Sequence, residues 1–182
     1  VGAGSACKLA ALKLIEQARS LAAEKLEVEP SQVEYATGVF HTRGSKRKIG
    51  LHELAKAGAI NVMAEGSFGS TFPNGCHITE VEIDPATGFA RIVAYNAVDD
   101  CGNVINHAIV EGQVHGAVTQ GAGQIFSEQV VYDRQTGQLL TGSFMDYCMP
   151  RAGLVPDIRM QDHPVPSVNN TLGVKGVGES GC

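Results

Sequence analysis

The sequence has few charged residues, no tryptophan and no long apolar run, and these absences exclude several classes of protein. Charged residues make up 18% of the 182, and the net charge is −5. No apolar stretch approaches the roughly 20 residues that a transmembrane helix needs. The one basic cluster, at residues 43–48, lacks the interleaved aromatic side chains that stack on bases. We therefore expect neither a membrane span nor a nucleic-acid partner.

The cysteines and histidines lack the spacing of metal sites and disulfide frameworks. The five cysteines are odd in number and contain no CxxC pair, and the six histidines show no HxxxH or HxH spacing. The cysteines are Cys7, Cys76, Cys101, Cys148 and Cys182. We expect no metal held directly by side chains, a reducing cytoplasmic location, and Cys101 and Cys148 as small buried hydrophobic residues.

Apolar periodicity and turn residues predict the main elements. Helical spacing predicts helices over residues 5–26, 51–63 and 109–126, with Ser5 as the N-cap of the first. Strands are predicted near residues 33–35 and 157–161, with a polar loop at 41–48 and a polar turn at 99–103. Hairpins are predicted around the turns 84–88 and 134–137.

The order of these elements gives the fold class. Helices and antiparallel hairpins are segregated rather than regularly alternating, which is typical of an α+β fold. We expect residues 1–75 to hold the N-terminal helices and a glycine-rich loop. Residues 76–182 are expected to hold the hairpins, a glycine-rich helix and a catalytic loop.

The most informative motif is the glycine-rich sequence GVKGVGESG at residues 173–181. Glycines let the backbone run close to a bulky group, and here they flank a lone carboxylate, Glu179, which suits a general base in a pocket. The lysine precedes the glycines and no GK[ST] follows, so this is not a phosphate-binding loop. From the residues alone, a solvated surface loop is an equally good interpretation.

A second motif, GQVHG at residues 112–116, lies near the start of the glycine-rich helix. Each glycine in a helix interior costs about 1 kcal/mol relative to alanine, so close packing against a backbone or a ligand must offset that cost. The Gln113 amide, next to Gly112, can offer a donor and an acceptor to a large polar cofactor. Ordinary helix packing is the alternative.

Several motifs, in their order and spacing, resemble one family. They are CHITEVEIDP at 76–85, NVIN at 103–106, EGQVHGA at 111–117, QG at 120–121 and KGVGE at 175–179. Together they resemble the C-terminal part of the molybdopterin-binding large subunit of the xanthine oxidase family, particularly its carbon monoxide dehydrogenase-like and aldehyde oxidase-like members. Any one of these motifs alone would be a weak signal.

The resemblance implies oxidative hydroxylation of an aldehyde, an N-heterocycle or a carbon monoxide-like substrate, with water as the oxygen source. It implies a molybdenum-molybdopterin cytosine dinucleotide cofactor, with iron-sulfur clusters and FAD on partner subunits or domains. The family's catalytic glutamate falls on Glu179, and its cofactor-contacting glutamine falls on Gln113. Cofactor-lining positions fall on Gly112, Lys175, Gly176, Val177 and Gly178. Gln113 and Glu179 should then converge on one cleft, within about 10 Å of each other.

Other cofactor loops of the family would precede Val1, and no iron-sulfur motif is present. We therefore expect a fragment that supplies one wall of the cofactor site alongside the rest of the large subunit. By itself it should bind no molybdenum and show no turnover. The alternative is a cofactor-free interaction module that keeps the scaffold without the chemistry. The motifs do not specify the substrate.

Overall fold

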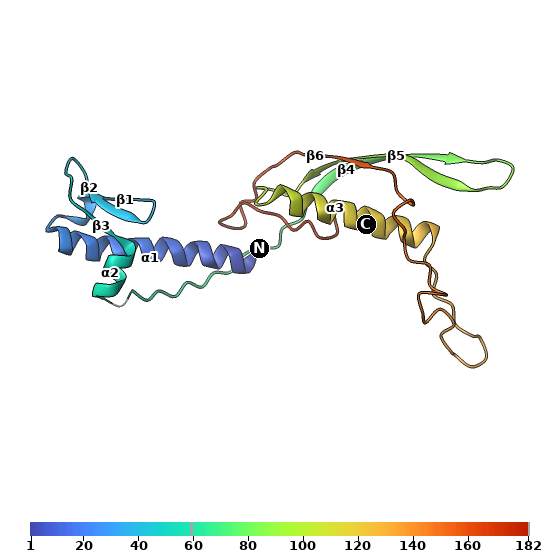
Figure 1. Cartoon of the computed structure of the whole chain (residues 1–182), viewed down its shortest axis with the longest axis horizontal. Coiled ribbons are helices and arrows are strands. Elements are labelled where there is room, and N and C mark those ends of the chain that lie inside the picture. The colour runs from blue at the N-terminus through green and yellow to red at the C-terminus, as the bar shows by residue number, and fades with distance from the viewer. Residues whose placement is uncertain (59, 182) are drawn as a thin grey trace. The chain divides into compact units, whose positions relative to one another are not determined.

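The computed structural model describes residues 1–58 and 60–181 and divides into two compact units. Unit 1 comprises Val1–Gly69 and Asn170–Leu172, and unit 2 comprises Ser70–Asn169 and Gly173–Cys182. Figure 1 labels their helices and strands. Each unit has its own cluster of buried apolar side chains.

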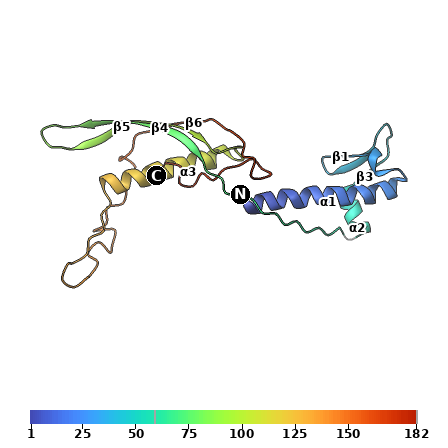
Figure 2. The ribbon, with the colours of Figure 1, turned by 180° about the vertical axis from the view of Figure 1, so that it is seen from behind.

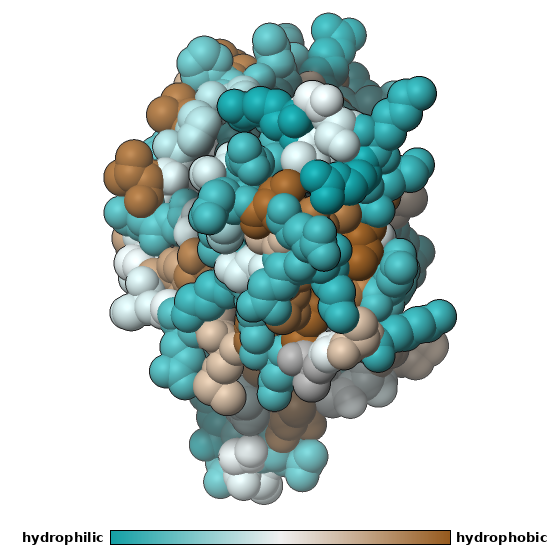
Figure 3. All heavy atoms as spheres, turned by 90° about the vertical axis from the view of Figure 1, so that its left-hand side faces the viewer, coloured by the Kyte–Doolittle hydropathy of each residue, from teal (hydrophilic) through white to brown (hydrophobic). Residues whose placement is uncertain are grey.

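Unit 1 packs a long helix and a short one against a small antiparallel sheet. Its elements are α1 (Gly2–Leu26), the 3-10 turn η1 (Pro30–Gln32), β1 (Val33–Ala36), β2 (Val39–Thr42), β3 (Lys48–Gly50) and α2 (Leu51–Ala57). The strands lie in the order β1-β2-β3. Alanines 18 and 22 of α1 are fully buried against Phe40, and their small size lets the sheet approach the helix closely. The face turned to the viewer in Figure 3 is largely hydrophilic.

Two sequence expectations in unit 1 were wrong at the helix ends. Ser5 is not an N-cap: α1 begins at Gly2, and Ser5 is fully buried inside the helix. Contacts made within unit 1 favour the longer helix, because Thr171 Oγ1 donates to the Ser5 carbonyl and Lys8 Nζ donates to the Thr171 carbonyl at 2.6 Å. The helix predicted over 51–63 ends at Ala57, where Gly58 takes an extended conformation. Strands β2 and β3 also occupy the two ends of the predicted polar loop.

Unit 2 is a three-stranded sheet with one helix along one face. Strands β4 (Asn74–Ile83) and β5 (Ala90–Asp100) form the predicted hairpin, and α3 (His107–Phe126) lies against their sheet in both ribbon views (Figures 1 and 2). Ala97 from the sheet packs with Val114 and Val118 from the helix to form the core. Asp84 closes the hairpin turn by accepting from Ala86 N at 2.9 Å and Thr87 Oγ1 at 2.7 Å.

The third strand, β6 (Ile158–Asp162), confirms the strand expected at 157–161 but pairs with β5 in parallel. A parallel partner needs a long crossover connection, and here α3 lies within that connection. The second predicted hairpin forms as a minimal antiparallel pair. An isolated bridge between Tyr132 and Leu139 flanks its turn, Asp133 N donates to the Gln138 carbonyl at 2.8 Å, and Leu140 N donates to the Val131 carbonyl at 2.9 Å. Tyr132 and Leu139 are exposed, so no apolar layer extends this pairing into longer strands.

The other differences concern a turn and a cysteine. Asp99 and Asp100, expected in a polar turn, are the last residues of β5. Cys101 is buried as expected, whereas Cys148 is exposed; Cys182 lies outside the described residues. Within residues 1–58 and 60–181, no helix combines the length and apolar character needed to cross a membrane. The same residues contain no trio of His, Cys, Asp or Glu side chains that could hold a metal ion.

Candidate functional site

The terminal segment, residues 173–181, is bonded to the turn that follows β5. Asn103 N donates to the Gly173 carbonyl at 2.8 Å, and Lys175 N donates to the Cys101 carbonyl at 2.8 Å. Gly102 and Gly173 have φ angles of 70° and 68°, in the left-handed region that favours glycine. A Cβ atom on Gly102 would also collide with the Gly173 carbonyl oxygen. This backbone junction therefore requires glycine at position 102.

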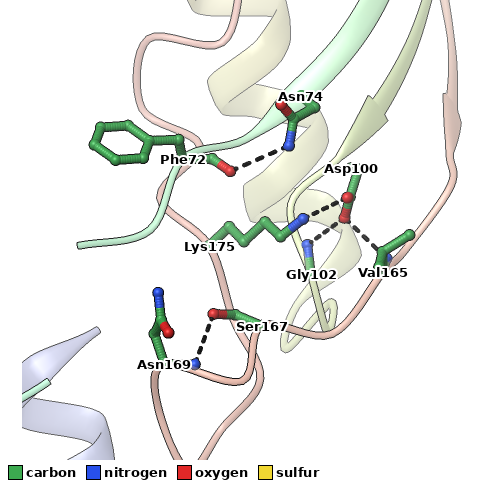
Figure 4. A network of polar contacts seen from close by, with 8 residues as sticks. All are labelled: Phe72, Asn74, Asp100, Gly102, Val165, Ser167, Asn169 and Lys175. Carbon is green, nitrogen blue, oxygen red and sulfur yellow. Dashed lines mark hydrogen bonds and ion pairs between the residues drawn. The ribbon is translucent and has the colours of Figure 1, made fainter. Parts of the chain in front are cut away.

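A partly buried ion pair strengthens the junction (Figure 4). Lys175 Nζ donates to Asp100 Oδ2, while Asp100 Oδ1 accepts from the backbone N–H groups of Gly102 and Val165, both at 2.9 Å. Burial raises the pKa of Asp100, but the Lys175 hydrogen bond and charge and the two N–H groups outweigh burial and lower it to about 2. The Lys175 side chain therefore holds the terminal segment in place through Asp100. Since this side chain is already engaged, Lys175 can line a cofactor site only with its backbone atoms.

This ion pair predicts a loss of stability in acid. The pKa of Asp100 lies below its ordinary value of 3.8, so its contribution is present above about pH 4 and is lost as the pH falls toward 2. We expect Asp100→Asn to lower the unfolding temperature at pH 6 and to reduce the difference between pH 6 and pH 2. Thermal unfolding across this range measures both. An equally steep acid dependence in wild type and variant would contradict the assignment.

Helix α3 is buried on one face and open on the other. Its start is fixed by Asn106 Oδ1, which accepts from Ile109 N at 3.1 Å. The open face consists of Ile109, Gly112, Gln113, Gly116 and Gln120. A Cβ atom added at Gly112 or Gly116 would meet nothing within 4 Å. The described chain thus gives no packing reason for these two helix glycines.

The terminal segment runs beside this helix. Val177 packs against the core formed by Ala97, Val114 and Val118. A Cβ atom on Gly178 would lie 3.6 Å from Gln113 Nε2. The residue preceding Glu179 therefore lies beside the Gln113 amide, although 65 positions separate Gly178 from Gln113 in the sequence. In the part of the chain that the structure describes, neither the Gln113 nor the Glu179 side chain has a hydrogen-bond partner.

Glu179 lines an open pocket of about 480 Å³, and Gln113 is not among the lining residues. The start of β4 provides Pro73, Asn74 and Gly75 to this pocket, and the terminal segment provides Glu179, Ser180 and Gly181. The remaining lining residues are His77, Tyr95 and Asp99. Gly178, beside the Gln113 amide, and Glu179, in the pocket lining, are thus consecutive residues of the terminal segment.

Sequence reasoning missed the polar cluster of His77, Tyr95 and Asp99. His77 Nδ1 lies 3.0 Å from the Tyr95 hydroxyl, and His77 Nε2 lies 3.1 Å from Asp99 Oδ2. The Asp99 side chain is 2% exposed. The register of the hairpin could have indicated the cluster, because His77 pairs with Ala97, between Tyr95 and Asp99 on one face of β5.

Comparison with known proteins decides the family. The model of the molybdopterin cofactor-binding domain matches residues 1–156. The chain belongs to this family. It is 34% identical over 193 residues to the 6-hydroxypseudooxynicotine dehydrogenase complex subunit gamma of Paenarthrobacter nicotinovorans, covering 98% of this chain and 24% of that protein. It is likewise 34% identical to the carbon monoxide dehydrogenase large chain of Hydrogenophaga pseudoflava, with the same coverage.

Solved structures agree with the fold of this molybdopterin cofactor-binding domain. A Cu,Mo-CO dehydrogenase in its carbon monoxide reduced state superposes with a TM-score of 0.84 at 33% identity, covering 98% of this chain and 24% of that one. Quinoline 2-oxidoreductase from Pseudomonas putida 86 gives 0.77 at 34% identity, covering 94% and 24%. The chain therefore spans about a quarter of the length of these relatives.

Proposed function

We propose that this chain forms one wall of the molybdenum cofactor site in the large subunit of a molybdenum hydroxylase, with Glu179 as the general base. The observation that carries the proposal is the open glycine face of α3 beside the terminal segment. Gly112 and Gly116 are unexplained by any packing in the described chain, and Gly178 lies next to the Gln113 amide. A large group seated on this face would account for all of these features.

The donors and acceptors present suit a pterin-type group. The Gln113 amide supplies both a donor and an acceptor, and the backbone of residues 176–178 is free of bulky side chains apart from Val177, which is turned into the core. We therefore assign cofactor contacts to Gly112, Gln113 and the backbone of residues 175–178. When bound, the molybdenum cofactor supplies the redox chemistry of carbon hydroxylation with oxygen from water.

In this proposal one residue of the chain accepts a proton and others hold it and the cofactor in position. Glu179 is exposed at the edge of the pocket, so its carboxylate can reach a proton on a reacting group there. The Asp100–Lys175 pair and the Gly102 junction hold the backbone that carries it. Gln113, beside Gly178, orients the cofactor through its amide and takes no proton.

The finer parts of the proposal come from the relatives. Their names include a carbon monoxide dehydrogenase, a nicotine 6-hydroxylase, a quinoline 2-oxidoreductase and an aldehyde oxidoreductase, so we propose an aldehyde, an N-heterocycle or carbon monoxide as the substrate class. We also propose the cytosine dinucleotide form of the cofactor, iron-sulfur and FAD partner subunits, the rest of the large subunit as a covering partner, and a cytoplasmic location.

The open face of α3, which carries Gly112 and Gly116, provides a test that does not depend on the substrate. We expect Gly116→Leu in the intact subunit to lower bound molybdenum about tenfold, because an overpacked contact costs about 1–3 kcal/mol and tenfold corresponds to about 1.4 kcal/mol. Elemental analysis of purified enzyme measures it. Gln124→Leu, an exposed position in the last turns of the same helix, is the matched control. Wild-type molybdenum content in Gly116→Leu would show that the cofactor does not sit on this face of α3, whereas an intact wild-type subunit without molybdenum would favour a cofactor-free interaction module.

A further inference from the structure

The His77 cluster makes a chain of polar groups from the pocket into the protein. Tyr95, His77 and Asp99 all line the pocket that Glu179 lines, and all four belong to unit 2. The His77 side chain is 18% exposed, whereas Asp99 is almost completely buried. The His77 and Tyr95 rings also pack edge to face, with centroids 5.7 Å apart. The orientation of the imidazole is therefore set by contacts at both of its nitrogens and by the packing of its ring on Tyr95.

The partners of the imidazole determine where its protons lie. With Asp99 as a carboxylate, which only accepts, His77 Nε2 carries the hydrogen that is donated to Asp99 Oδ2. Burial raises the pKa of Tyr95, a hydrogen bond with Thr79 lowers it, and the Asp99 charge raises it, with a net increase. The 3.0 Å between the Tyr95 hydroxyl and His77 Nδ1 suits a phenol that donates to the imidazole. In this assignment the imidazole accepts from the phenol and donates to the buried Asp99 side chain.

The position of Asp99 favours the uptake of one proton by the His77 imidazole. An imidazolium at His77 would lie 3.1 Å from the Asp99 carboxylate, which would stabilise its charge. The other titratable groups of the pocket lining are Tyr95 on β5 and Glu179 on the terminal segment. Helix α3 contributes no residue to the lining. Within the lining, His77 is therefore the one nitrogen base beside Glu179.

We propose that Tyr95 and His77 form a relay that returns Glu179 to its carboxylate form between turnovers. This inference rests on the proposed role of Glu179 as general base. After Glu179 has taken a proton, its O–H bond breaks and the proton passes through pocket water to the Tyr95 oxygen. Tyr95 gives its own hydrogen to His77 Nδ1 at the same time, so the phenol is regenerated. His77 later returns the proton from Nδ1 through the Tyr95 oxygen to the water of the open pocket, and no electrons move.

A relay that regenerates Glu179 should affect the rate of later turnovers but not the rate of the first. Glu179 begins as a carboxylate, so we expect Tyr95→Phe and His77→Gln to leave the first reduction of the holoenzyme by substrate within about twofold of wild type. Their steady-state kcat should fall about tenfold or more, because the loss of a proton-transfer group slows the step that it serves. Added imidazole should restore part of the kcat of His77→Gln. Anaerobic stopped-flow and steady-state assays measure the two rates, with whichever of benzaldehyde, quinoline and carbon monoxide the wild-type enzyme oxidises.

Matched controls and Glu179→Gln distinguish the outcomes. Tyr132→Phe and His52→Gln alter an exposed tyrosine and an exposed histidine outside the pocket and should leave both rates unchanged. Tyr95→Phe keeps the ring that packs on His77, so folding and molybdenum content should match wild type. Unchanged kcat in both relay variants, or an equal slowing of the first turnover, overturns the relay. If Glu179→Gln itself leaves the first turnover fast, the proposed function fails instead.

Discussion

In the intact enzyme, Glu179→Gln is expected to lower turnover about 100- to 10,000-fold while molybdenum content stays at the wild-type level. Removing a positioned general base typically has an effect of this size. Glutamine keeps the shape of the side chain but cannot take a proton at the required strength. The exposed Glu179 side chain makes no hydrogen bond within the described chain, so its replacement should leave the fold intact.

The measurement is steady-state turnover divided by bound molybdenum, determined on the same preparation. Glu80→Gln, at an exposed position on β4, is the matched control and should behave as wild type. Turnover near that of wild type in Glu179→Gln would remove the glutamate from the mechanism.

The second large effect is expected from Gly102→Ala. Gly102 has φ of 70°, and a Cβ atom there would collide with the Gly173 carbonyl and lie 3.1 Å from Lys175 N. The new methyl group would therefore push the terminal segment away from its junction. Since a displacement of about 1 Å at a catalytic group can cost about 100-fold, we expect turnover to fall at least that much.

A hairpin glycine provides a control for backbone strain alone. Gly88 has nearly the same φ, 73°, but a Cβ atom added there would meet nothing within 4 Å. Gly88→Ala should therefore reduce the free energy of unfolding only by the roughly 1–2 kcal/mol that alanine costs in the left-handed conformation. It should lower the unfolding temperature and leave turnover per molybdenum unchanged. Equal activity in the two alanine variants would show that the Gly102 junction does not position Glu179.

The sequence predicted the elements that are specified locally. The turn at 84–88 has an aspartate whose carboxylate caps it and a glycine with positive φ, so the β4–β5 hairpin followed from its own residues. The helix over 109–126 followed from apolar spacing, because its buried residues lie on one face. The family resemblance rested on motifs with a fixed order, and the family model and the relatives confirm it.

Features that depend on distant partners could not be predicted. Asp99 and Asp100 form a pair typical of turns, yet they end a strand and their side chains point to different partners, His77 and Lys175. Lys175 is 75 positions from Asp100, and no local pattern indicates that contact. The parallel direction of β6 likewise depends on the path of the chain through α3, which periodicity does not reveal.

The most direct test of the central claim is an experimental structure of the intact holoenzyme with its molybdenum cofactor bound. We expect the Gln113 amide to lie within hydrogen-bond distance of the cofactor, about 3 Å, and the cofactor to cover Gly112 and Gly116. The Glu179 carboxylate should face the metal from the terminal segment. A cofactor seated elsewhere, with Gln113 and an ordered Glu179 both turned away from it, would contradict the account.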